Sequence, residues 1–157
     1  MAWRGSNTVS DRIFASLPYL LPLVDGLPYG GILFGQFPIL AVVFLPLQPL
    51  MMINSVPFAG LIIFFILYLA VVRNEKISHF IRFNTMQAIL LDILLVLCGL
   101  LLQILLPALG KNLLTETLLN VVFLGTVAAC FYSMVQSLLG RYAEIPTLSE
   151  AVHAQVR

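Results

Sequence analysis

Charged residues are scarce in this sequence. Asp, Glu, Lys and Arg together make up 10% of the 157 residues, whereas 61% are hydrophobic and the mean hydropathy is +1.03. A soluble globular domain usually contains about 25% charged and about 45–50% apolar residues. The composition therefore excludes a water-soluble protein and predicts an all-α integral membrane protein, with residues 1–157 as a single membrane domain.

The sequence also lacks a strong net charge and any recognisable reaction chemistry. Its formal net charge is +1, so it has no basic field that would attract nucleic acid. It contains no phosphate-binding glycine loop, nucleophile elbow or paired-carboxylate motif. His79 and His153 have no metal-ligand spacing around them. We therefore expect no enzyme activity, no metal, no cofactor and no nucleic-acid partner.

Only two cysteines are present, Cys98 and Cys130, and each lies inside a long apolar run. Cysteines in this setting usually fill space between packed helices. A disulfide or a ligand role is the alternative interpretation.

Long apolar runs dominate the rest of the chain. A spanning helix needs about 20 mostly apolar residues, and the runs 56–72, 85–106 and 118–139 meet or approach this length. Pro107 and Gly110 follow the second of these runs and act as helix-stop signals. These three runs are predicted to be transmembrane helices.

The first fifty residues contain apolar segments that prolines and glycines interrupt. Residues 13–34 are long enough to cross a membrane, but Pro22, Asp25 and Gly26 interrupt them, so we expect a kinked first span. This break is either a binding site of the kind that broken transporter helices form, or an ordinary turn at the membrane surface. The proline-rich segment 36–54 is predicted to be interfacial or re-entrant, giving four spans in total.

The basic residues support this four-span arrangement. If 36–54 does not cross, seven of the eight lie on one side of the membrane, and only Lys111 lies on the other. The seven are Arg4, Arg12, Arg73, Lys76, Arg82, Arg141 and Arg157. The positive-inside rule then places both chain ends, including the polar tail 141–157, on the cytoplasmic or stromal side.

Polar residues recur on one face of the third predicted span. At about 100° per residue, Asn84, Gln87, Asp92 and Gln103 fall within one stripe. A carboxylate at this depth costs about 3 kcal/mol, so the stripe must face other helices or a cavity. It either packs the bundle through hydrogen bonds or lines a path for a substrate. In the last span, small residues between Thr126 and Gly140 form a second face, which we interpret as a packing face.

The loop before the third span carries two predicted interface anchors. Arg82 stands where a basic side chain can meet lipid phosphate. Phe83 stands at the depth that aromatic rings favour.

The run Arg82-Phe83-Asn84-Thr85-Met86-Gln87-Ala88 also carries a family resemblance. Together with the segment 17–30 and the tail Gly140-Arg141-Tyr142-Ala143-Glu144-Ile145-Pro146, it resembles the 20-kDa membrane subunit of the Tic translocon, the translocon at the inner envelope membrane of chloroplasts. The similarity covers about residues 11–150. No long transit segment precedes the first apolar run, which is typical of a cyanobacterial or plastid-encoded member.

The resemblance implies a four-span protein that helps preproteins to cross a membrane, as part of a protein-conducting channel. The implied partners are the lipid bilayer, other membrane proteins, preproteins and further copies of the chain. The alternative is a non-catalytic structural or assembly subunit of a larger membrane complex, such as a photosynthetic one. A small-solute transporter ranks third, because the chain shows none of the internal repeats that many transporters carry.

Overall fold

The computed structural model describes residues 8–145 and 148–156, and all the secondary structure in these ranges is helical. Arg4, Arg157 and Pro146, which entered the sequence arguments, lie outside the described residues. By length and composition, three helical runs in the described residues could span a membrane, and a bent helix pair gives a fourth if the pair counts as one span. The predicted helical membrane bundle with a kinked first span is confirmed, and the interfacial or re-entrant placement of segment 36–54 stays a prediction.

The first span is one continuous but kinked helical run, Val9–Gln36. It consists of α2 (Val9–Ser16), η1 (Leu17–Tyr19), α3 (Leu20–Gly26), η2 (Leu27–Gly30) and α4 (Gly31–Gln36). Each of the two 3₁₀ turns has a proline in its first positions, Pro18 in η1 and Pro28 in η2. Proline lacks the N–H that an α-helix needs at an interior position, and the chain tightens at these two places.

A proline-rich stretch of short helices follows. It contains α5 (Ile39–Val43), η3 (Leu45–Leu47), α6 (Gln48–Asn54), α7 (Ala59–Leu67) and the π-helical turn η4 (Tyr68–Val72). Residues 55–58, which we call the break, separate α6 from α7. Across the break the chain turns by 97°, and Phe58 adopts a left-handed conformation with φ 65°.

The helix predicted for residues 56–72 thus begins at Ala59 in the structure. The 9 residues of α7 and the 5 of η4 extend about 21 Å, which is less than the roughly 30 Å of a hydrocarbon core. Leu45–Asn54 and Ala59–Val72 make up a span only as a bent pair. The exact bounds of the four spans remain predictions.

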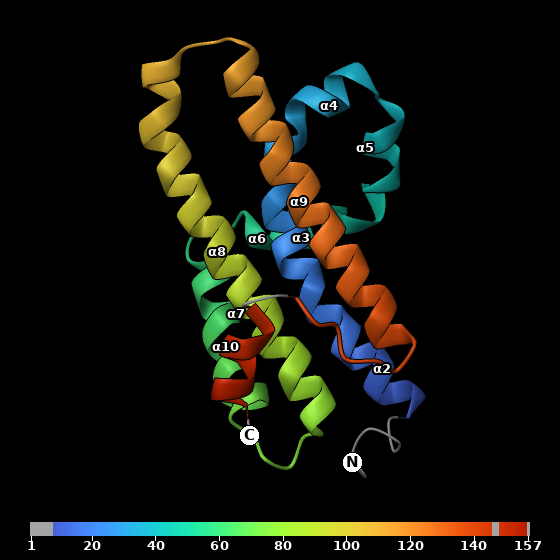
Figure 1. Ribbon diagram of the computed structural model, residues 1–157. Coiled ribbons are helices and arrows are strands. Elements are labelled where there is room, and N and C mark those ends of the chain that lie inside the picture. The colour runs from blue at the N-terminus through green and yellow to red at the C-terminus, as the bar shows by residue number, and fades with distance from the viewer. Residues whose placement is uncertain (1–7, 146–147, 157) are drawn as a thin grey trace.

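The two long helices are α8 (His79–Leu109) and α9 (Leu113–Leu138), joined by a short turn. Ser78 caps α8 by accepting the amide of Ile81 at 3.4 Å, and Asn112 caps α9 by accepting that of Thr115 at 3.1 Å. The short α10 (Leu148–Gln155) packs back on α8. Figure 1 shows α8 and α9 running antiparallel, with the first span packed against both.

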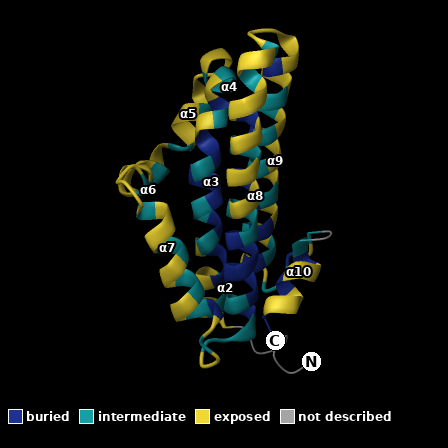
Figure 2. Cartoon of the chain, turned by 90° about the vertical axis from the view of Figure 1, so that its left-hand side faces the viewer, coloured by how far each residue is buried: buried dark blue, intermediate teal, exposed yellow. Residues whose placement is uncertain are grey.

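The start of α2, the end of α10 and the loop between η4 and α8 lie at the same end of the bundle, whereas the α8–α9 turn lies at the other (Figure 1). The first of these ends therefore carries several basic residues, and we call it the basic end. They include Arg12, Arg73, Lys76 and Arg82, whereas Lys111 lies at the second end. Burial is concentrated toward the first end, where α2, α3, α8 and α10 meet (Figure 2).

Candidate functional site

The predicted polar stripe on α8 divides into two separate groups. At the basic end, Asn84 and Gln87 are both fully buried. The amide oxygen of Asn84 accepts the hydroxyls of Tyr19 (2.7 Å) and Ser137 (3.0 Å), and its nitrogen donates to the carbonyl of Phe80 (2.8 Å). Asn84 thereby connects the first span and α9 to α8.

Gln87 extends these contacts to the C-terminal segment. Its nitrogen donates to the Tyr19 hydroxyl (3.0 Å) and to the carbonyl of Ala143 (2.9 Å), and its oxygen accepts the hydroxyl of Ser149 (2.8 Å). The Ser149 hydroxyl also accepts the amide of Ile145 at 2.7 Å. We call the set of Tyr19, Asn84, Gln87, Ser137 and Ser149 the buried network. Both of its amide side chains use donor and acceptor groups, so the buried network joins the first span, α8, α9 and the C-terminal segment.

The second group lies at the middle of the bundle. Asp92 is half-buried near the centre of α8, about 20 Å along a helix about 46 Å long. Its carboxyl group interacts with that of Asp25 on α3, and the side-chain nitrogen of Asn54 donates to an Asp25 oxygen. We call Asp25, Asn54 and Asp92 the central cluster. The three side chains line one small cavity between α3, α6, α7 and α8.

Asn54 was missed by the sequence analysis. Its signal was a polar residue at the end of the apolar segment 36–54, directly before the turn that contains Pro57. Nothing in the sequence placed it beside Asp25, because the contact joins α6 to α3, two helices whose packing residue spacing does not reveal.

The other residues of the predicted first-span break serve the helix packing. Asp25 and Gly26 lie inside the helical run rather than in an open turn, and Pro22 is buried. Gly26 faces α9 so closely that a methyl group in its place would lie 2.7 Å from Cγ2 of Thr126. The small-residue face of α9 is thus in contact with the first span of the same chain. Gln103 is exposed on α8 and belongs to neither polar group.

The two predicted interface anchors lie in different surroundings. Nε of Arg82 donates to the carbonyl of Val72 at 2.9 Å, at the end of η4. Phe83 is completely buried, and its ring packs on Tyr142 (4.9 Å between centroids) and His153 (4.8 Å). It also belongs to a core cluster with Val152 and Val156. Phe83 therefore holds the C-terminal segment against α8, a position that leaves no exposed ring for the lipid headgroups.

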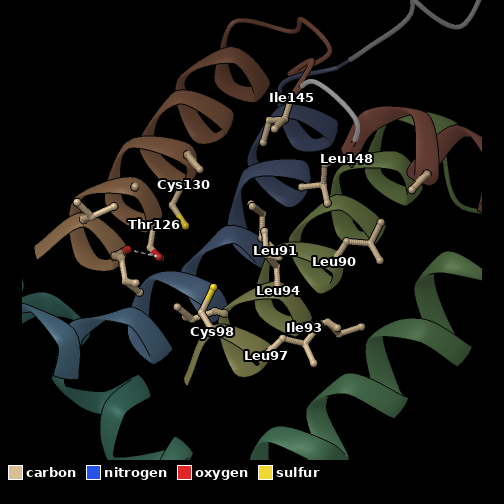
Figure 3. Close-up of a pocket in the computed structure, with 16 residues that line it drawn as sticks. Leu90, Leu91, Ile93, Leu94, Leu97, Cys98, Thr126, Cys130, Ile145 and Leu148 are labelled. Atoms are coloured by element: carbon tan, nitrogen blue, oxygen red, sulfur yellow. Dashed lines mark hydrogen bonds between the residues drawn. The ribbon is translucent and has the colours of Figure 1, made fainter. Parts of the chain in front are cut away.

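A groove of about 660 Å³ runs between α8 and α9 and is closed at one end by Ile145 and Leu148 (Figure 3). Nearly all of its lining is apolar, and the free thiols of Cys98 and Cys130 point into it. Within residues 8–145 and 148–156, no group of three His, Cys, Asp or Glu residues is arranged to hold a metal ion. The grooves of this surface suit apolar segments rather than a polar solute.

Comparisons with a family model and with curated proteins all point to the same family. A family model described as "Chloroplast import apparatus Tic20-like" matches residues 9–152. A "Tic20 family protein" of Synechocystis is 52% identical, over 100% of this chain and 99% of that protein. "Protein TIC 20-II, chloroplastic" of Arabidopsis thaliana is 38% identical over 94% of this chain and 73% of that protein. The "Tic20 family protein Ycf60" of Gracilaria tenuistipitata var. liui is 35% identical over 95% of this chain and 76% of that protein.

Proposed function

Because this chain belongs to the Tic20-like family of the chloroplast import apparatus, we propose that it is a membrane component of a protein translocon, which helps polypeptides to cross or enter a membrane. The observation that carries this proposal is the family match over residues 9–152, which includes the buried network and the central cluster. The names of the plant relatives place those proteins in chloroplasts.

Several features of the bundle support a role in guiding polypeptides. The described part of the chain is almost wholly helical and apolar, and the α8–α9 groove offers an apolar surface to a passing hydrophobic segment. Asp92 and Asp25 are carboxyl groups at the centre of the bundle, where polar groups usually face a substrate path or another protein. We assign Asp92 to the path-facing part of this protein, and Asn84 and Gln87 to its packing.

We extend the proposal to the membrane, the partners and the orientation of the protein. The protein acts without catalysis, in a cyanobacterial membrane or a plastid inner envelope, together with other membrane proteins and precursor chains. Its basic end faces the cytoplasm or stroma, which is supported by the position of Arg12, Arg73, Lys76 and Arg82 opposite Lys111.

Affinity purification of the tagged chain tests this function. The chain is extracted from its native membrane in mild detergent while a precursor protein is arrested in transit. We expect mass spectrometry to identify translocase or insertase components and the arrested precursor. Stoichiometric recovery of a photosynthetic or respiratory complex without precursor would overturn the proposal in favour of an assembly subunit.

A matched pair of variants tests the role of Asp92. Asp92→Leu removes the central carboxyl group, whereas Gln103→Leu removes an exposed polar group from the same helix. We expect Asp92→Leu to lower precursor recovery and Gln103→Leu to leave it unchanged, with similar thermal stability in detergent. An equal loss in both variants, or none in either, would show that Asp92 does not face the path.

A further inference from the structure

A groove of about 590 Å³ separates the first span from α7, and we call it the α7 groove. The first span forms one wall, α6, α7 and η4 form the other, and α8 contributes Ile81 and Thr85. Among its lining residues, Phe14 is 56% and Leu17 is 46% exposed, so the groove is open toward the surroundings of the bundle. Of these lining residues, all of which the structure describes, only Thr85 is polar.

The length of the α7 groove is close to the thickness of one leaflet of a bilayer. The groove extends from Val71 and Ile77, at the basic end, to Ile53 of α6. Figure 2 shows α7 running along the outside of the bundle toward that end. Ile63 and Val71, which both line the groove, are about 12 Å apart along this helical run. Half of a hydrocarbon core is about 15 Å thick.

The volume of the α7 groove fits an acyl chain better than a helix. A helix about 10 Å across fills roughly 900 Å³ over 12 Å of its length, whereas the groove offers about 590 Å³. A transmembrane helix of another protein therefore cannot enter it fully. An acyl chain is thinner, matches the apolar lining and is present in every membrane.

Basic side chains without an ion-pair partner stand at the basic end of the groove. Arg73 and Lys76 lie in the loop between η4 and α8, whose Ile77 lines the groove. Both are exposed, and neither is in an ion pair with any residue that the structure describes. Together with Arg82 they make three basic residues against one acidic residue, Glu75. Basic pockets between transmembrane helices at a membrane surface bind anionic lipid headgroups.

Thr85 adds a hydroxyl group without a partner at the edge of the hydrocarbon region. It is the first residue of the predicted span 85–106 and is completely buried. A threonine in a helix can donate to the carbonyl four residues before it, as Thr117 and Thr126 do here. The Thr85 hydroxyl has no partner within the described residues. The ester groups of a phospholipid lie between its headgroup and its acyl chains, so an ester oxygen is an acceptor available at this depth.

We propose that the α7 groove binds one anionic phospholipid from the leaflet at the basic end. Arg73 and Lys76 bind its phosphate, and the Thr85 hydroxyl donates to an ester oxygen. One acyl chain lies along the groove toward α6 and fills the space between the first span and α7. This site goes beyond the proposed function and does not depend on it, because it follows from the groove and the charges at its end.

Native mass spectrometry tests the charge of the headgroup. The protein is freed of native lipid in mild detergent and given equal amounts of phosphatidylglycerol, which is anionic, and phosphatidylcholine, which is zwitterionic, with the same acyl chains. We expect the parent protein to retain one phosphatidylglycerol in preference to phosphatidylcholine. The double variant Arg73→Gln, Lys76→Gln should retain about tenfold less of it. The control, Lys111→Gln, Arg141→Gln, removes the same charge outside the groove and should retain the parental amount.

A second set of variants tests the groove itself. Ile63 lines the groove, whereas its neighbour Ile62 is 56% exposed and does not. Ile63→Trp should fill the groove and abolish retention, and Ile62→Trp should leave it at the parental level. Thr85→Val keeps the shape of the side chain but removes the hydroxyl, so retention should fall several-fold. Thermal unfolding in detergent confirms that each variant is folded. The charge variants change exposed loop residues and remain informative if a groove variant does not fold.

The proposal is overturned if the parent protein retains no lipid or retains both lipids equally. It is also overturned if Arg73→Gln, Lys76→Gln or a folded Thr85→Val variant retains the parental amount, or if Ile63→Trp and Ile62→Trp retain equal amounts. None of these results changes the recovery of arrested precursor that tests the proposed function, so the lipid site and that function can fail separately.

Discussion

The basic end of the bundle and the segment from α5 to α7 both contain side-chain amides, but these amides lie in opposite surroundings. At the basic end, the amides of Asn84 and Gln87 are completely buried and are bonded on every side. In α6, the amide of Asn54 makes one contact with Asp25 at the edge of an exposed segment that contains no buried residue. The amides of the first region are bonded within a single chain, whereas the second region is exposed and the amide of Asn54 has one printed contact.

This difference predicts that the two regions contribute differently to the stability of the isolated protein. Changes in the basic end should lower the stability of the isolated protein, because the groups that they remove have partners in the same chain. Changes in the α5–α7 segment should have small effects on the isolated protein and larger ones in the native membrane. Four variants test this contrast, from the largest expected effect to the smallest.

Phe83→Ala should have the largest effect. It removes a fully buried ring from the cluster with Val152, Val156 and Tyr142, leaving a cavity under the C-terminal segment. We expect a loss of about 3 kcal/mol in the free energy of unfolding. Thermal unfolding in detergent measures this loss. As a control, Phe58→Ala removes a ring that is 78% exposed and should cost much less. Equal losses would contradict the contrast between the two regions.

Gln87→Leu should follow. The leucine has a similar volume but deprives Ser149, Tyr19 and the carbonyl of Ala143 of a partner. Leaving such groups buried and unpaired costs about 2–3 kcal/mol. Limited proteolysis should then cleave the segment after Gly140 sooner than in the parent protein. The control is Gln103→Leu, on the exposed part of the same helix, and the protease should cleave this variant at the parental rate. Parental cleavage of Gln87→Leu would show that the buried network does not hold the tail.

Gly30→Ala tests the contact between the first span and α9. A methyl group at Gly30 would lie 2.6 Å from Cε1 of Phe123, so the ring and the helix must shift. Overpacking of this kind costs about 1–3 kcal/mol, which a lower thermal midpoint would reveal. Gly125→Ala is the matched control, because nothing lies within 4 Å of a methyl group there. A smaller effect at Gly30 than at Gly125 would argue against this helix contact.

Asn54→Ala should have the smallest effect on stability. It removes a single hydrogen bond to Asp25 from a half-buried position, worth about 1 kcal/mol. The sensitive readout is hydrogen exchange, which should accelerate in α6 and in the first turn of α7 and stay unchanged in α8. Ser55→Ala, which removes a hydroxyl that donates to the carbonyl of Met52 in the same short helical stretch, is the control. Exchange that is unaltered in α6 would mean that Asn54 does not hold this segment.

The sequence predicted the helical membrane class, the kinked first span and the family, because hydropathy, proline positions and a contiguous motif are all local signals. It predicted one polar stripe from Asn84, Gln87 and Asp92, but Gln87 and Asp92 point about 140° apart at 100° per residue, and different elements pack against them. Gln103 shares that spacing but is exposed, because spacing says nothing about which neighbouring element covers each turn.

The sequence alone therefore determined what each segment is made of: apolar helices, a first span interrupted by prolines and glycines, and polar residues in the third predicted span. Only the tertiary structure decided what those polar groups do. Tyr19 of the first span, Ser137 of α9 and Ser149 of α10 surround Asn84 and Gln87, so these amides stabilise packing. The packing of α6 beside α3 brings Asn54 to Asp25, and residues 55–58 after it are exposed. The reason is physical: a hydrogen bond depends on the distance and direction between two groups, and contacts between residues far apart in the chain are fixed only when the helices pack.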